Sequence, residues 1–452
     1  MSKDQDLPAL RRSDFPADFR WGVSTSSYQI EGAVKEGGRG ESIWDRFCSE
    51  PGRILDASSG AEACDHYHRW PQDLDLAENL GVNAYRFSIA WPRVIPKGRG
   101  AINAAGLDFY DRLADGMLAR GLQPWATLYH WDLPQVLQEQ GGWLNRDTVA
   151  AYLEFTDAVT RRLGDRVKHW ITHNEPWCAC FMSYWEGVHA PGGRVFKDAL
   201  LANHHVLLSH GQAIPLIRAN VQDANVGITL SLHPIVAASD SAEDQAALVR
   251  HDGLRNRWFL DPLHGRGYPA DMLELFGNQV PNIQPGDMES IANAVDFLGV
   301  NYYFPEVVAD APGVEPIATQ LVERHGVERT AFGWEVSPQG MVDLLTRIQR
   351  DYAPRVPIYL TENGSTYEDV LRPDGTVHDE LRLSYLARHL AALRQAMDHG
   401  VEVRGYFAWS LLDNFEWAAG YTRRFGLAYV DYPTQARILK SSGHWYRRFL
   451  SP

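Results

Sequence analysis

Two glutamates stand directly after hydrophobic segments of the sequence, and together they could perform acid–base and nucleophilic chemistry. Glu175 follows Trp-Ile-Thr-His-Asn at 170–174, and Glu362 follows Ile-Tyr-Leu-Thr at 358–361. If both segments are buried strands, both carboxyl groups lie at strand ends and are held there rather than free in solvent. A pair of inward carboxyl groups is the minimum equipment for cleaving a glycosidic bond, because one must be protonated and the other ionised. Proximity alone can produce that difference, since a charged carboxylate raises the pKa of its neighbour.

Either glutamate could instead have a structural role, paired with a buried arginine or a backbone amide. For one glutamate at a strand end this is the commoner situation, because most ionisable groups in proteins do no chemistry. The alternative weakens when two such glutamates occur, each preceded by Thr or Asn and close to aromatic residues. Pro176 adds a local constraint, because a residue before proline avoids the helical region. We therefore expect Glu175 to be extended, with its side chain directed by the strand pleat.

Eight short apolar segments, each ending in polar residues, recur along the chain. Near-continuous hydrophobicity, as in Ile358-Tyr359-Leu360, is typical of strands covered on both faces, which is the condition in a parallel sheet. We expect the strands within Phe19–Ser24, Ala84–Trp91, Pro124–Trp131, Trp170–Glu175, Val226–His233, Phe297–Tyr303, Ile358–Glu362 and Gly405–Leu412.

Segments with helical spacing lie between these runs. Apolar residues at 107–118 form one stripe that ends before Gly121, and those at 149–163 do the same before Gly164; residues 381–397 give a third stripe. Strands that alternate with helices predict an α/β protein, a single (β/α)8 TIM barrel with elaborated βα loops. An open, doubly wound sheet remains the alternative.

Functional groups of such a barrel collect at the C-terminal ends of its strands. The longest intervals between runs, at 232–297 and 303–358, are expected to shape the mouth of the pocket there. The polar or aromatic residues at the predicted strand ends are Arg86, His130, Asn174, Glu175, Asn301, Tyr303, Glu362 and Trp409.

The composition is that of a globular protein. The chain has 452 residues, 45% of them hydrophobic, and its 43 Lys and Arg against 57 Asp and Glu give a net charge of −14. That balance argues against a nucleic acid or an anionic membrane as the main partner. We expect one catalytic domain over residues 1–452, with residues 1–15 as a flexible N-terminal extension. A homo-oligomer is compatible with these features.

The cysteine content and the start of the chain favour a cytoplasmic protein. Four cysteines are too few for a disulfide scaffold in a chain of this length. The first residues contain no apolar core of signal-peptide length, and no run of eighteen apolar residues occurs.

No metal or other cofactor is expected. Cys64, His66 and His68 are close together, but no second half of a zinc site accompanies them, and a polar structural cluster is the better interpretation. The glycines at 37–40 lack the preceding strand and the acidic partner of a dinucleotide site.

Three sequence blocks, in order, resemble glycoside hydrolase family 1 β-glucosidases. The first is Phe-Arg-Trp-Gly-Val-Ser-Thr-Ser-Ser-Tyr-Gln-Ile-Glu-Gly-Ala at 19–33, which is similar to the N-terminal signature of the family. The second is Thr-His-Asn-Glu-Pro at 172–176, and the third is Leu-Thr-Glu-Asn-Gly at 360–364. The resemblance extends from Phe19 to about Tyr446, and it implies a β-glucosidase of barrel fold.

The resemblance also implies roles for individual residues. Glu175 matches the general acid/base and Glu362 the nucleophile of a retaining double displacement, in which the two carboxyl groups lie about 5–5.5 Å apart. Arg86 and Tyr303 would keep Glu362 ionised and oriented. The residues that match sugar- or aglycone-binding positions are Gln29, His130, Trp131, Asn174, Asn301, Tyr303, Trp334, Trp409, Glu416, Trp417 and Phe425.

The expected substrates are small β-glucosides and short β-linked oligosaccharides, with tolerance for β-galactosides or β-fucosides. Relatives that cleave 6-phosphorylated glycosides carry Ser where Glu416 stands, so a non-phosphorylated sugar is favoured. Myrosinase-like relatives replace the acid/base glutamate by Gln, whereas Glu175 is intact. Two alternatives stay open: a transglycosylating enzyme, and an inactive carbohydrate-binding relative.

Overall fold

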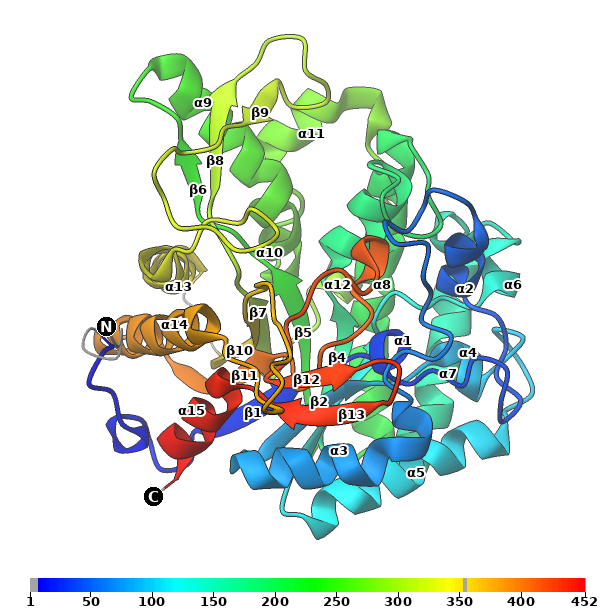
Figure 1. Cartoon of the computed structure of the whole chain (residues 1–452). Coiled ribbons are helices and arrows are strands. Elements are labelled where there is room, and N and C mark those ends of the chain that lie inside the picture. The colour runs from blue at the N-terminus through cyan, green and yellow to red at the C-terminus, as the bar shows by residue number, and fades with distance from the viewer. Residues whose placement is uncertain (1–6, 353–355, 452) are drawn as a thin grey trace.

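Eight parallel strands close into a barrel in the computed structural model, which describes residues 7–352 and 356–451. Figure 1 shows the arrangement of the elements. Each strand pairs with the next along the chain, and β1 also pairs with β11, so the sheet has no free edge. The (β/α)8 barrel is therefore confirmed, and the open sheet is wrong. The barrel strands are β1 (Arg20–Ser24), β2 (Ala84–Ser88), β3 (Gln123–Tyr129), β4 (His169–Asn174), β5 (Asn225–Ser231), β7 (Phe297–Asn301), β10 (Ile358–Asn363) and β11 (Val403–Trp409).

Amphipathic helices cover the outside of the barrel. The three predicted helical stripes are found as α5, α7 and α14, and each buries its apolar face. The longer helices are α3 (His66–Leu80), α5 (Ala104–Ala119), α7 (Asp147–Leu163), α8 (Phe196–Asn220), α9 (Ala242–Asp252), α13 (Pro338–Tyr352), α14 (Glu380–Asp398) and α15 (Ser441–Leu450). Shorter helices are α1 (Ser27–Ile30), α2 (Ile43–Ser49), α4 (Trp91–Val94), α6 (Gln135–Gln138), α10 (Trp258–Leu263), α11 (Ala270–Phe276) and α12 (Asp287–Ile291). Single turns of 3-10 or π type are Arg12–Asp14, Gly142–Leu144, Cys178–Met182, Gly253–Arg257, Gly277–Gln279 and Trp417–Ala419.

Large side chains fill the barrel interior below the strand ends. Six residues from six strands form a separate buried cluster: Ala84, Trp125, Ile171, Phe297, Tyr359 and Phe407. Because strand side chains alternate in direction, Ala84 shares its inward face with Arg86, and Phe407 shares its face with Trp409. The apolar cluster is thus the floor below the polar strand ends.

The long βα loops contain further strands. Strands β6 (Ile235–Ala237), β8 (Glu306–Asp310) and β9 (Thr319–Leu321) form a small sheet of their own. With α9 they lie at the top of Figure 1, away from the C-terminal helix α15. After β11, the hairpin of β12 (Ala428–Asp431) and β13 (Ala436–Leu439) leads into α15. The expectation that the intervals 232–297 and 303–358 form elaborated loops is met.

The N-terminal segment packs on the barrel earlier than expected. A 3-10 turn spans Arg12–Asp14, and the Arg12 Nη1 donates to the Leu450 carbonyl at 2.8 Å. Phe15 is buried, with its ring 4.9 Å from that of Trp21. The expected flexible extension is therefore wrong for residues 12–15, because aromatic packing and a hydrogen bond to α15 hold them. Residues 1–6 lie outside the described part of the chain.

Within residues 7–352 and 356–451, none of the helices combines the length and the apolar character that crossing a membrane requires.

Candidate active site

A cavity of about 620 Å³ opens at the C-terminal ends of the barrel strands, and both predicted carboxyl groups line it. Glu175 directly follows β4, and Glu362 is the fifth residue of β10. Both are buried, with exposed fractions of 5% and 4%. The barrel therefore brings together two glutamates that are 187 positions apart in the sequence.

The backbone of Glu175 differs from the expected extended conformation. Its φ is +47°, although its N–H still donates to the Thr229 carbonyl of β5 at 2.9 Å. The pairing of β4 with β5 also shifts register between Ile171 and Asn174. The prediction was wrong because the strand ends in a sharp turn into the following helical residues, and this turn aims the side chain. Such a conformation costs on the order of 1–3 kcal/mol and is characteristic of functional sites.

Glu362 is held by a cation and a phenol. The Arg86 Nη1 lies 2.5 Å from one carboxylate oxygen, and the Tyr303 hydroxyl donates to the other at 2.7 Å. Burial raises the pKa of Glu362 to about 7, against the Arg86 charge that lowers it, while the nearby Glu175 raises it further. Both contacts favour the ionised carboxylate, so they counteract the cost of its burial.

Glu175 is held by neutral groups. The Asn301 Nδ2 donates to its Oε1 at 2.7 Å, and the Cys178 Sγ donates to its Oε2 at 3.1 Å. Burial raises the pKa of Cys178, so this side chain is a neutral thiol. No cation contacts Glu175 among the described hydrogen bonds and ion pairs, in contrast to Glu362.

Asn174 connects the two carboxyl groups. Its Oδ1 accepts from the Arg86 Nη2 at 2.6 Å and from the Asn301 Nδ2 at 3.1 Å. A continuous chain of hydrogen bonds therefore runs from Glu362 through Arg86, Asn174 and Asn301 to Glu175. The Asn174 Nδ2 also lies 3.1 Å from the Nε2 of His130, whose pKa is lowered by burial and by the Arg86 charge.

A third carboxyl group, that of Glu416, lines the same cavity. Burial, with Glu362 and Glu175 nearby, raises the pKa of Glu416 to about 8. The Gln29 Nε2 lies 3.4 Å from Glu416 Oε2 and donates to the Phe415 carbonyl at 3.0 Å. Gln29 thus fixes the loop around Glu416.

Aromatic side chains form the walls of the cavity. Trp409 and Trp417 each have a ring centroid 6.0 Å from that of the His130 imidazole, and both rings are nearly parallel to it. Farther out, the Trp334 ring stacks on Phe304 at 4.8 Å and on Phe332 at 4.7 Å.

Most of the predicted site residues meet in this cavity, and the rest support it. Lining it are His130, Trp131, Glu175, Tyr303, Trp334, Glu362, Trp409, Glu416, Trp417 and Phe425. Directly behind, in contact with those residues, lie Gln29, Arg86, Asn174 and Asn301.

Sequence reasoning missed several lining residues. Trp177 and Cys178 follow Glu175 and Pro176 directly, and that proximity was a usable signal. The others belong to βα loops, whose packing is tertiary: Met182, Trp185, His189, Phe304 and Phe332.

An α/β barrel with two buried glutamates at the ends of β4 and β10, one bound to a guanidinium and the other to an amide, is the arrangement expected of a glycoside hydrolase. The sequence model of glycosyl hydrolase family 1 matches residues 11–451. The chain belongs to this family.

Individual relatives agree over nearly the full length. The chain is 46% identical to a β-glucosidase of an Agrobacterium species over 446 residues, which are 98% of this chain and 97% of that protein. It is 43% identical to a 1,4-β-D-glucan glucohydrolase of Thermotoga neapolitana over 433 residues, 96% of this chain and 97% of the relative. The solved structure of a Thermotoga maritima β-glucosidase with glucoimidazole superposes with a TM-score of 0.93 at 44% identity, covering 96% and 98% of the two chains.

Proposed function

We propose that this protein is a retaining β-glucosidase that removes terminal β-D-glucosyl residues by double displacement through a covalent glycosyl-enzyme. The observation that carries the proposal is the unequal environment of two glutamates on one cavity. Glu362 has a guanidinium and a phenol as donors, whereas Glu175 has an amide and a thiol. The guanidinium and the phenol favour the negative charge on Glu362, and the proposed mechanism assigns the proton of the pair to Glu175.

In the first step the Glu362 carboxylate attacks the anomeric carbon, and the bond from that carbon to the leaving oxygen breaks. The proton of Glu175 passes to the leaving oxygen, which departs as an alcohol or a shorter sugar. Esterification of Glu362 removes its charge, and Glu175 then carries the single negative charge of the pair.

In the second step Glu175 takes a proton from water, and the resulting oxygen attacks the anomeric carbon. The ester bond to Glu362 breaks, and the carboxylate is regenerated beside Arg86 and Tyr303. Two inversions leave the product in its original β configuration.

The inner part of the cavity supports a non-phosphorylated glucosyl unit as the substrate. Glu416 is the expected partner of the 4- and 6-hydroxyls, and a carboxyl group there disfavours a phosphate. Asn174 is the expected partner of the 2-hydroxyl, where contacts strengthen in the transition state. We extend the proposal to β-galactosides and β-fucosides. A galactoside differs from a glucoside only in the direction of its 4-hydroxyl, and a fucoside in addition lacks the 6-hydroxyl, so both keep the contact of the 2-hydroxyl with Asn174.

The outer aromatic wall supports aryl β-glucosides and short β-linked oligosaccharides as substrates. Flat rings such as Trp334 and Phe425 offer apolar surface to a sugar ring or an aromatic aglycone. A Thermotoga neapolitana relative is named a 1,4-β-D-glucan glucohydrolase, and a role in the breakdown of cellulose fragments fits this class. The four cysteines are free thiols, which favours the reducing cytoplasm as the location.

Glu362→Ala tests the proposal. We expect hydrolysis of 4-nitrophenyl β-D-glucoside to fall by about 10⁴-fold or more, because the attacking group is removed. Azide should restore release of nitrophenol and give the α-glucosyl azide, since one displacement inverts the anomeric carbon. The matched control is Glu154→Ala, which removes an exposed carboxyl group on α7 that binds Arg99. If Glu362→Ala hydrolyses the glucoside at close to the wild-type rate, the proposed mechanism is wrong.

A further inference from the structure

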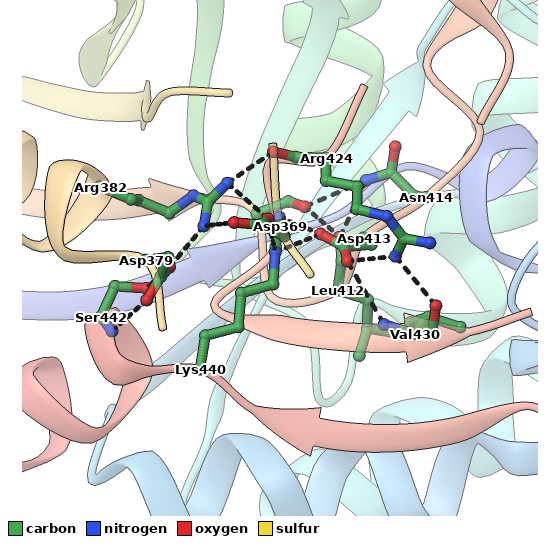
Figure 2. A network of polar contacts seen from close by, with 12 residues as sticks. Asp369, Asp379, Arg382, Leu412, Asp413, Asn414, Arg424, Val430, Lys440 and Ser442 are labelled. Atoms are coloured by element: carbon green, nitrogen blue, oxygen red, sulfur yellow. Dashed lines mark hydrogen bonds and ion pairs between the residues drawn. The ribbon is translucent and has the colours of Figure 1, made fainter. Parts of the chain in front are cut away.

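A buried ionic cluster includes Asp413 and Arg424, which are the two ends of the loop that carries Glu416. Figure 2 shows the cluster from close by. It contains as many carboxylates as cations, so their charges balance within the protein. Lys440 and Asp413 have no exposed surface. The six charged members, which we call the C-terminal ionic cluster, are Asp369, Asp379, Arg382, Asp413, Arg424 and Lys440.

Lys440 is the centre of the cluster. It stands between β13 and α15, and its Nζ lies 2.5 Å from Asp369 and 2.6 Å from Asp413. The carboxylate of Asp369 also accepts hydrogen bonds from both Nη groups of Arg382 on α14, at 2.8 and 3.0 Å. Arg382 and Lys440 together lower the pKa of Asp369 against the opposing effect of its burial. The segment that follows the nucleophile strand β10 is thereby tied to α14 and to the start of α15.

The cluster also fixes both ends of the loop from Asp413 to Arg424. Asp413 accepts from Lys440 and, at 2.9 Å, from the N–H of Gly426. The Arg424 Nη1 lies 2.6 Å from Asp413, and the Arg424 carbonyl accepts from Arg382 at 2.8 Å. Glu416 and Trp417, which line the cavity, lie between these fixed ends.

A short path leads from the cluster to the carboxyl group of Glu416. Asn414 is adjacent to Asp413, and its Oδ1 accepts from the Gln29 Nε2 at 3.1 Å. Gln29 in turn holds the Phe415 carbonyl and contacts Glu416. A displacement of Asp413 therefore reaches Glu416 through Asn414 and Gln29, whereas the supports of Glu362 come from β2 and from Tyr303 after β7.

Stability alone is a weak explanation for such a cluster, because burying ion pairs costs about as much as their attraction returns. The cluster instead holds both ends of the one loop that carries Glu416, which indicates a role in positioning that residue.

We propose that Lys440 and Asp369 are positioning residues, which fix Glu416 so that the enzyme recognises the 6-hydroxyl of the glucosyl unit. This inference rests on the proposed β-glucosidase activity and identifies residues that contribute to its sugar specificity. Neither residue touches the substrate; each acts through Asp413 and the loop.

The test compares two substrates that differ only in the hydroxyl concerned. Lys440→Met and Asp369→Asn are assayed with 4-nitrophenyl β-D-glucoside and with its 6-deoxy analogue. We expect kcat/KM for the glucoside to fall by about tenfold in each variant, the upper end of the range for the loss of one hydrogen bond. The 6-deoxy glucoside should lose several-fold less than the glucoside, because only the contact of Glu416 with the 4-hydroxyl remains to be weakened.

Arg146→Met is the matched control. It removes the guanidinium that lies 2.5 Å from the buried Asp287, far along the chain from the loop, and it should not change the ratio of the two substrates. If Lys440→Met does not fold, the isosteric Asp369→Asn carries the test. Equal losses on both substrates, or no loss on either, would overturn the positioning role. Failure of the wild-type protein to hydrolyse the glucoside would instead contradict the proposed function itself.

Discussion

Removing one hydroxyl group, in Tyr303→Phe, tests how Glu362 is kept ionised. The phenol donates to one oxygen of the buried carboxylate at 2.7 Å, while Arg86 holds the other. A hydrogen bond to a charged group contributes about 1.5–3 kcal/mol, so its loss should lower kcat/KM by roughly 10- to 150-fold. The ring of the variant still fills its place, and a cavity is not created.

The same change should alter the pH dependence in a defined direction. Tyr303 stabilises the ionised form, so its loss raises the pKa of Glu362, by about 1–2 units if the whole contribution falls on that form. Glu362 must be ionised to attack. The acid limb of the kcat/KM profile should therefore move to higher pH, and the loss of activity should be largest in acidic buffer.

The assay is the initial rate with 4-nitrophenyl β-D-glucoside across a pH series. Tyr302→Phe is the matched control, because the neighbouring hydroxyl donates to the Ser337 carbonyl at 2.6 Å and points away from Glu362. The reasoning is refuted if Tyr303→Phe keeps kcat/KM within about twofold of wild type with an unmoved acid limb.

Two further predictions concern the proposed acid/base residue and the barrel floor. Cys178→Ala removes a weak donor to Glu175, so kcat/KM for 4-nitrophenyl β-D-glucoside should fall by roughly two- to fivefold; a kcat/KM equal to that of the wild type would contradict a role for this contact. Trp125→Ala empties the buried floor and should lower the free energy of unfolding in urea by about 3–5 kcal/mol with KM unchanged; a loss below about 1 kcal/mol would contradict the packing described.

The barrel and the inner site could be predicted because both follow from local pattern. Alternation along a buried strand places Arg86 and Trp409 on the inward face, and the floor residues Ala84 and Phe407 share that face. The proposed catalytic pair follows from the same pattern, since both glutamates stand at strand ends.

The patterns of strands and helices alone did not identify the site residues whose position depends on long loops. Glu416 and Gln29 lie away from predicted strand ends and were recognised only through the family resemblance. The turn at Glu175 was mispredicted because the preference set by Pro176 describes one dipeptide, whereas the backbone there is fixed by the hydrogen bond to Thr229. Nothing local to the sequence joins Lys440 to Asp369, because their contact exists only once the barrel has closed.

The central claim is that Glu362 forms a covalent bond to the glucosyl unit. The most direct measurement is mass spectrometry of the protein after reaction with 2,4-dinitrophenyl 2-deoxy-2-fluoro-β-D-glucoside, followed by peptide mapping. We expect one 2-deoxy-2-fluoroglucosyl group, attached to the peptide that contains Glu362 and absent in Glu362→Ala. Attachment to another residue, or turnover of an aryl glucoside with no adduct formed, would contradict the account.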